Sequence, residues 1–145
     1  MKLEQLYKSI ITEAFNDSFP YTVGVKSDMS ERYFFDAGPY EMEVYVSGFD
    51  GPIPVVGFYP ANTYNHDSTA AFAASGVNPV KVFSTVFTIL KKSDLVKKAG
   101  NVFDMEVNKS ENSRMSLYKR MANRYAKKTQ DVDSRGKYLT LRVWF

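Results

Sequence analysis

Apolar residues recur at helical spacing, three or four positions apart, in several parts of the chain. A stripe of this kind through residues 2–15 predicts an amphipathic opening helix that ends before Pro20. Asn78 and Pro79 suit the N-cap and the first turn of a second helix, which we expect to end at Gly100. Apolar residues wrap most of this second helix, so it is predicted to be nearly buried.

Alternating apolar and polar residues predict strands in other parts of the chain. The segments expected to be extended are residues 21–26, 32–37, 41–48, 53–59, 102–108 and 137–145. Turn residues, Gly38-Pro39 and Asp50-Gly51-Pro52, separate the early segments, which favours an antiparallel meander. Residues 60–78 show neither periodicity and predict a long loop, a kind of segment that often carries function.

An apolar stripe and a cationic stripe run side by side along residues 110–128. Tyr118, Met121 and Tyr125 fall on the apolar stripe, while Arg120 and Arg124 fall beside it. The pattern predicts a helix capped at its start by a serine, with its cations pointing outward. The candidate partner-binding residues are Arg114, Arg120, Arg124, Lys127 and Lys128. Two interpretations stay open, a solvated helix face and a surface that binds an acidic partner.

The predicted order is helix, strand meander, helix, strand, helix, strand. It indicates an α+β fold, with a mainly antiparallel sheet flanked by helices. The length of 145 residues predicts a single domain over residues 1–145, and 44% apolar with 24% charged residues is typical of a folded protein. No apolar run is long enough for a membrane helix, so we expect a soluble protein without a membrane partner.

Charge and cysteine content narrow the chemistry. The net charge is +3, with an acidic excess in residues 1–75 and a basic excess in residues 76–145. This asymmetry predicts either steering of an acidic partner or head-to-tail association of copies. The chain has no cysteine and a lone histidine, His66, which excludes disulfides and thiol nucleophiles and leaves no metal site to predict.

The predicted order, together with Leu117-Tyr118 and Arg120, resembles the N-acetyltransferase (GNAT) superfamily. In that family an L-Y-x-[KR] signature supplies a tyrosine near the sulfur of coenzyme A, so the resemblance implies Tyr118 as general acid. It also implies acetyl-CoA or another acyl-CoA as cofactor. The cofactor-binding residues that it implies are Gly76, Asn78, Val80 and Lys81.

The chain departs from that family where the cofactor phosphates bind. The family has a glycine-rich loop, whereas here Gly76 is soon followed by Pro79, which lacks an amide donor. Acyl transfer also needs a base, and Glu41, Glu43 and Glu106 are candidates only by their placement on strands. The sequence therefore favours a protein without efficient catalysis and without a resident cofactor.

A second likeness concerns two short sequence patterns. G-V-x-P-x-K-V-F-x-T-V at residues 76–86 and S-R-x-x-L-Y-x-R at residues 113–120 resemble a family of small proteins of tailed bacteriophages. The resemblance implies a phage accessory or virion-associated protein, in the host cytoplasm or in the virion. We expect it to bind an acidic partner through the basic helix. The alternatives are an acyl-CoA-dependent N-acyltransferase and a non-specific nucleic-acid-binding protein.

Overall fold

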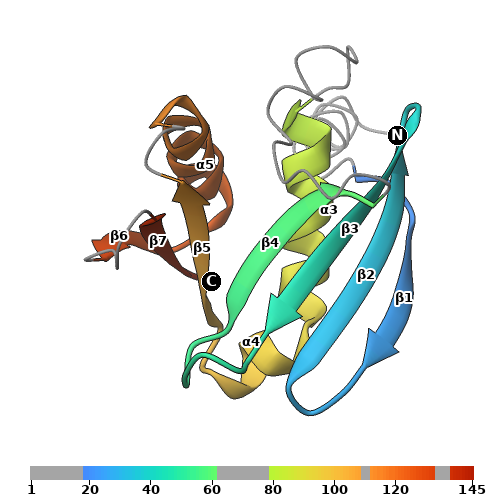
Figure 1. Cartoon of the computed structure of the whole chain (residues 1–145). Coiled ribbons are helices and arrows are strands. Elements are labelled where there is room, and N and C mark those ends of the chain that lie inside the picture. The colour runs from blue at the N-terminus through green and yellow to red at the C-terminus, as the bar shows by residue number, and fades with distance from the viewer. Residues whose placement is uncertain (1–17, 62–78, 109–111, 133–137) are drawn as a thin grey trace, which may run out of the picture.

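The structure is a computed structural model that describes residues 18–61, 79–108, 112–132 and 138–145. They form a seven-stranded sheet in the order β1-β2-β3-β4-β5-β7-β6 (Figure 1). The strands are β1 (Tyr21–Lys26), β2 (Ser30–Ala37), β3 (Tyr40–Ser47), β4 (Val55–Pro60), β5 (Val102–Asn108), β6 (Lys128–Val132) and β7 (Tyr138–Trp144). The helices are α3 (Pro79–Lys92), α4 (Asp94–Lys98) and α5 (Asn112–Tyr125). The helix expected over residues 2–15, most of the expected loop and the expected cap Ser110 lie outside the described residues.

The predicted meander is confirmed, since β1 to β4 pair in sequence order and antiparallel. Gly38 turns the chain between β2 and β3 with φ 61°, a left-handed conformation that glycine adopts without strain. β4 then pairs with β5 in parallel, through Val55 with Asp104 and Val56 with Met105. Past these residues the two strands diverge, β4 staying beside β3 and β5 staying beside β7 (Figure 1).

The predicted fold class, an α+β fold with a mainly antiparallel sheet flanked by helices in an acetyltransferase-like order, is wrong. The sheet is mixed, because β4 and β5 run parallel, and strands take up more of the described residues than helices do. The order also contains α4 and β6, which the sequence pattern did not reveal. The apolar spacing predicted one continuous helix through α4, and β6 is five residues long, too short for a periodic pattern to identify it as a strand.

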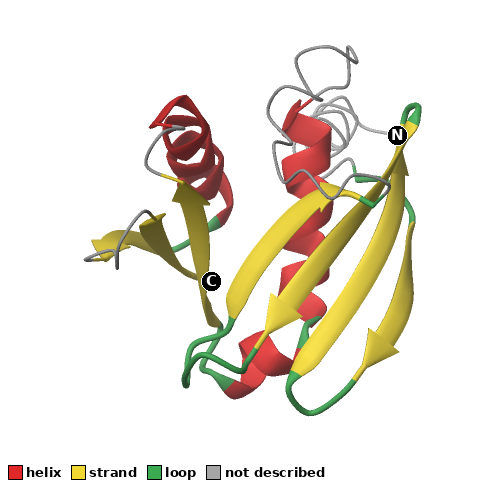
Figure 2. Ribbon diagram, viewed as in Figure 1, coloured by secondary structure: helices red, strands yellow, loops and turns green. Residues whose placement is uncertain are grey.

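Strand alternation gives the sheet one apolar face and one polar face. The long helix α3 lies against one face of the meander (Figure 2). On β3, Met42, Val44 and Val46 are completely buried, whereas Tyr45, which alternates with them, lies on the other face and is half-buried. We call the face away from the helices the open face. Charged residues on it, placed by strand pairing, are Arg32, Asp36, Glu41, Glu43, Asp104, Glu106 and Arg142.

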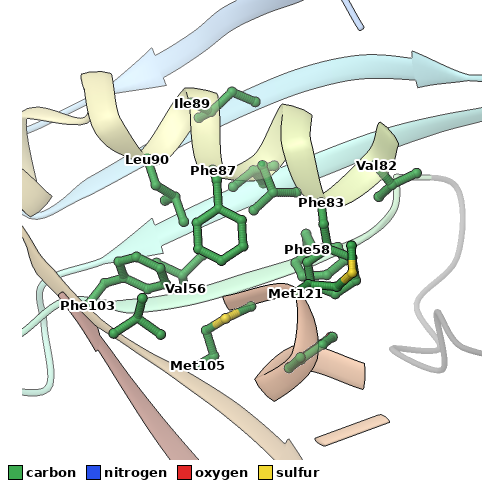
Figure 3. Packing of buried hydrophobic residues seen from close by; sticks show 14 of the residues in the cluster. Val56, Phe58, Val82, Phe83, Phe87, Ile89, Leu90, Phe103, Met105 and Met121 are labelled. Atoms are coloured by element: carbon green, nitrogen blue, oxygen red, sulfur yellow. The ribbon is translucent and has the colours of Figure 1, made fainter. Parts of the chain in front are cut away.

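Aromatic residues of α3 pack across the point at which β4 and β5 part. Phe83 contacts Phe58 of β4 with ring centroids 5.3 Å apart, and Phe87 contacts Phe103 of β5 at 6.0 Å (Figure 3). Phe87 also stacks on Tyr125 of α5 at 5.3 Å. Each such pair contributes about 0.5–1.5 kcal/mol beyond the area that it buries. α3 therefore joins the meander to the C-terminal strands and to α5.

The helix predicted from Asn78 to Gly100 is in fact divided. Ser93 lies between α3 and α4 with extended backbone, and its hydroxyl accepts a hydrogen bond from the amide of Val96, as an N-cap does. The same hydroxyl donates to Glu31 of β2 at 2.6 Å. The apolar spacing continues through Ser93, so the pattern concealed the break.

The basic helix is also shorter than predicted, because α5 ends at Tyr125 and Lys128 begins a strand. The amide of Lys127 donates to the Trp144 carbonyl at 2.9 Å, and β6 then pairs with β7 throughout its length. Pairing with an available strand edge thus sets the conformation of this polar segment.

Glu31 is a buried carboxylate, 1% exposed, that ties β2 to α4. It accepts hydrogen bonds from the Tyr33 hydroxyl at 2.8 Å, from the Ser93 hydroxyl at 2.6 Å and from the Leu95 amide at 3.1 Å. Burial, and to a smaller extent the hydrogen bond to Glu31, raises the pKa of Tyr33 above its ordinary value. The hydroxyl therefore stays protonated and acts as a hydrogen-bond donor to Glu31. The donors around Glu31 compensate its burial.

We predict that Glu31→Gln lowers the free energy of unfolding by about 1–3 kcal/mol. Both oxygens of Glu31 accept hydrogen bonds, and in glutamine the NH₂ group, which can only donate, replaces one of them. Glu41→Gln makes the same chemical change at an exposed position of β3 and serves as the matched control. Urea unfolding followed by circular dichroism measures both. Equal stability of the two variants would contradict the role assigned to Glu31.

Candidate functional site

Exposed cations gather at the C-terminal end of α5. Arg120 and Arg124 lie one helical turn apart and are both exposed, and Lys127 follows the helix and is exposed as well. None of them forms an ion pair within the part of the chain that the structure describes. We call Arg120, Arg124 and Lys127 the basic surface. It presents uncompensated positive charge at the surface of the described structure.

Two other cations of the predicted stripe, Lys128 and Lys119, are engaged elsewhere. Lys128 lies on β6, and its ammonium group is 4.8 Å from the ring centroid of Trp144, on the open face. The side chain of Arg114 lies outside the described part of the chain. Lys119, on α5 itself, forms an ion pair with Asp131 at 2.9 Å. Among the described side chains, the cationic stripe predicted from the sequence therefore keeps Arg120, Arg124 and Lys127.

Tyr118, the predicted general acid, lies among aromatic rings. It is 4% exposed, and its ring centroid is 5.4 Å from that of Phe58 and 5.3 Å from that of Phe83. These rings come from β4 and α3, so Tyr118 helps to fill the space between the diverging strands. Its role in the core is shown by these contacts, while a catalytic role stays a prediction.

The predicted cofactor-binding residues are not brought together as a described site. Gly76 and Asn78 lie outside the described residues. Val80 is half-buried and packs against the core, and the ammonium group of Lys81 lies 4.4 Å from the ring centroid of Phe19. Both side chains are thus engaged by groups of this chain.

The candidate general bases lie on the wrong side of the sheet for Tyr118. Glu41, Glu43 and Glu106 project from the open face, whereas Tyr118 packs on the face that the helices cover. Acid and base must both reach one reacting group, usually within hydrogen-bond distance or through one water. The sheet separates the three glutamates from Tyr118, so none of them forms an acid–base pair with it.

A pocket of about 450 Å³ lies on the open face, where the loop between β3 and β4 meets β5 and β7. Its polar lining comprises Asp50 from the loop, Asp104 and Glu106 from β5, and Thr140 and Arg142 from β7. Arg142 binds Asp104 through two hydrogen bonds, Nε to Oδ1 at 2.8 Å and Nη2 to Oδ2 at 3.1 Å. This pairing compensates the negative charge of Asp104, whereas the other carboxylates of the pocket have no paired cation in the described part of the chain.

The pKa of Glu106 reflects the burial and the negative charge of the pocket. Burial raises the pKa of its carboxyl group above the ordinary value, and the negative charges of Asp50 and Asp104 raise it further. Neither Glu106 nor Asp50 forms an ion pair among the described residues. The pocket is therefore a place where added positive charge is favourable.

Elsewhere on the open face the charges are compensated. Arg32 forms an ion pair with Glu43, and its guanidinium group lies 4.5 Å from the ring centroid of Tyr45. The hydrogen bond to Glu43 raises the pKa of Arg32, which stays charged in any case. Uncompensated acidity on this face is thus concentrated near the pocket and at the exposed residues Asp36 and Glu41.

This pocket could not be predicted from the sequence because its residues are far apart in the chain. The available signal was alternation, which puts Asp104 with Glu106, and Thr140 with Arg142, on one side of their strands. Only the register, in which Asp104 faces Arg142 and Glu106 faces Thr140, brings the two strands' residues together.

Comparison of the chain with protein-family models, with curated proteins and with solved structures finds no match. Over the described ranges, no group of three or more histidine or acidic side chains is placed to hold a metal ion. No helix within those ranges is long and apolar enough to cross a membrane. The basic surface and the pocket are therefore the features of the described structure that bear on function.

We predict that Glu106→Gln stabilises the protein at neutral pH. Because the pKa of Glu106 is raised in the folded state, its stabilising contribution is complete below the ordinary value of 4.5 and is lost as the pH rises through the folded value. The gain at about pH 7 is below about 1 kcal/mol, since the residue is largely exposed, and it vanishes near pH 3.5. Urea unfolding at both pH values measures it, and a gain that persists in acid would contradict this account.

Proposed function

We propose that the chain is a binding module that docks an acidic protein surface through the basic surface of α5. The observation that carries this proposal is that Arg120 and Arg124 are exposed and without ion pairs in the described structure, whereas Lys119 on the same helix is paired. Arginine binds carboxylates through two parallel hydrogen bonds, which makes a pair of arginines one turn apart suited to acidic side chains.

The arrangement favours a protein over a nucleic acid. Proteins that follow a phosphate backbone make about 6–10 phosphate contacts, which need a long line of cations. Here Lys119 is engaged by Asp131, and Lys128 turns to the opposite face of the sheet. What remains is a compact cationic group of about two helical turns, which matches a small acidic patch better than a duplex.

The biological setting of this binding follows from the resemblance to small proteins of tailed bacteriophages. On that basis the chain acts as an accessory or virion-associated protein, in the host cytoplasm or in the virion. The supporting residues are the patterns at residues 76–86 and 113–120, and α5 carries the second of them.

We predict that Arg120→Glu with Arg124→Glu weakens binding to fluorescent poly-L-glutamate at least tenfold, about 1.4 kcal/mol, in low salt. Lys97→Glu with Lys98→Glu is the matched control, because it makes the same change in net charge at exposed positions of α4. Fluorescence anisotropy at about 50 mM NaCl measures the affinities, and about 500 mM NaCl tests their salt dependence.

The control variant should bind almost as well as the natural chain. Equal losses in both variants would show a general effect of net charge and would contradict the assignment to α5. Duplex DNA is the second probe. The contrary outcome is that the natural chain binds DNA more tightly than poly-L-glutamate and loses this binding in the variant with Arg120→Glu and Arg124→Glu. That result would assign a nucleic acid, and not an acidic protein, as the partner.

Acyl transfer is the alternative function, and we predict that titration calorimetry with acetyl-CoA gives no binding heat at about millimolar ligand. The reason is that two of the implied cofactor-binding residues are engaged within the chain, since Val80 packs against the core and the ammonium group of Lys81 lies over the ring of Phe19. Saturable heat with one site per chain would favour the acyltransferase instead.

A further inference from the structure

The open face and the basic surface carry opposite, uncompensated charge. Within the described structure, Asp50 and Glu106 form no ion pair on the open face, and Arg120 and Arg124 form none on α5. Unlike Arg142 with Asp104 or Lys119 with Asp131, these groups have no opposite charge beside them in their own chain. Each set is complementary to the other.

One copy of the chain cannot satisfy both sets by itself. α5 packs on the helix-covered face, with Tyr118 and Met121 in the core, and turns Arg120 and Arg124 outward. An α-helix is about 10 Å across and the sheet lies beyond it, so these cations are more than a Debye length, about 8 Å, from the pocket. Attraction between the two sets inside one molecule is therefore largely screened.

We propose that the acidic partner of the basic surface is the open-face pocket of a second copy of this chain. This inference rests on the proposed function, since it assigns the partner of the same α5 residues. Charge complementarity supports the inference. In the described structure, Asp50 and Glu106 of the pocket have no paired cation, and Arg120 and Arg124 of α5 have no paired anion.

The spacing of the arginines can be compared with the size of the pocket. Arg120 and Arg124 are four residues apart on a helix, a rise of about 6 Å. Asp50 and Glu106 both line a pocket of about 450 Å³, whereas Asp104 in the same lining is already paired with Arg142. A ridge of arginines can therefore place one guanidinium in the pocket beside Glu106 while the next contacts its rim.

The contact joins two different surfaces, so it is head-to-tail. Such contacts leave one unused basic surface and one unused pocket at the ends of each dimer, and they continue into rings or open chains. Assembly through exposed charges weakens as salt rises. The natural chain should therefore form salt-sensitive species larger than a dimer at high protein concentration.

Neutral variants of each surface test the inference by sedimentation velocity. The helix variant carries Arg120→Gln and Arg124→Gln, and the pocket variant carries Asp50→Asn and Glu106→Gln. Each variant alone should be monomeric at a concentration at which the natural chain assembles, with its dissociation constant raised at least tenfold. An equimolar mixture should form a dimer and nothing larger, since only one complementary pair of surfaces survives.

The controls separate this inference from the proposed function. The pocket variant keeps the basic surface, so it should still bind poly-L-glutamate, and poly-L-glutamate should dissociate assemblies of the natural chain. The natural chain could instead stay monomeric at about 50 mM NaCl and about millimolar protein, yet bind poly-L-glutamate. That result would overturn the assignment of a second copy as partner and leave the proposed function standing. Assembly unaffected by either variant would overturn it too. Circular dichroism confirms that both variants are folded.

Discussion

The packing of α3 against a sheet that is apolar on one face only is the constraint on which the rest of the structure depends. Phe83 reaches Phe58 on β4, and Phe87 reaches Phe103 on β5 and Tyr125 on α5. β4 and β5 share only a short parallel pairing, so backbone hydrogen bonds alone join the two parts of the sheet weakly. The rings supply the missing connection, and they also fix where α5 lies.

The same constraint decides where charge can be placed. Because the helix-covered face must be dry, charged side chains go to the outer side of the helices or to the open face of the sheet. The acidic first part of the sequence builds β2 and β3, whose exposed carboxylates Asp36 and Glu41 lie on the open face. The basic second part builds the helices, and α5 turns Arg120 and Arg124 outward. An asymmetry along the sequence thus becomes an asymmetry between two faces.

The elements with clear periodicity could be predicted from the sequence, and those that depend on tertiary contacts could not. The bounds expected for β1 and β5 are confirmed, as is the outward placement of Arg120 and Arg124. The break at Ser93 was missed because its cause is a hydrogen bond to Glu31, which is 62 residues away. β6 was missed because pairing with β7, not its own composition, makes it a strand. The pocket was missed for the same reason, since only strand pairing assembles it.

The distribution of charge also restricts the symmetry of any assembly. A two-fold arrangement that brings α5 against α5 would oppose arginine to arginine, and one that brings open face against open face would oppose Glu106 and Asp50 to their own copies. Like charges at close range oppose association by several kcal/mol. The proposed head-to-tail contact would instead bring Arg120 and Arg124 of one copy to Asp50 and Glu106 of the next. In such a contact, the rotation that relates successive copies would decide whether they close into a ring or extend into a chain. That rotation would be set by how α5 enters the pocket between β5, β7 and the loop that precedes β4.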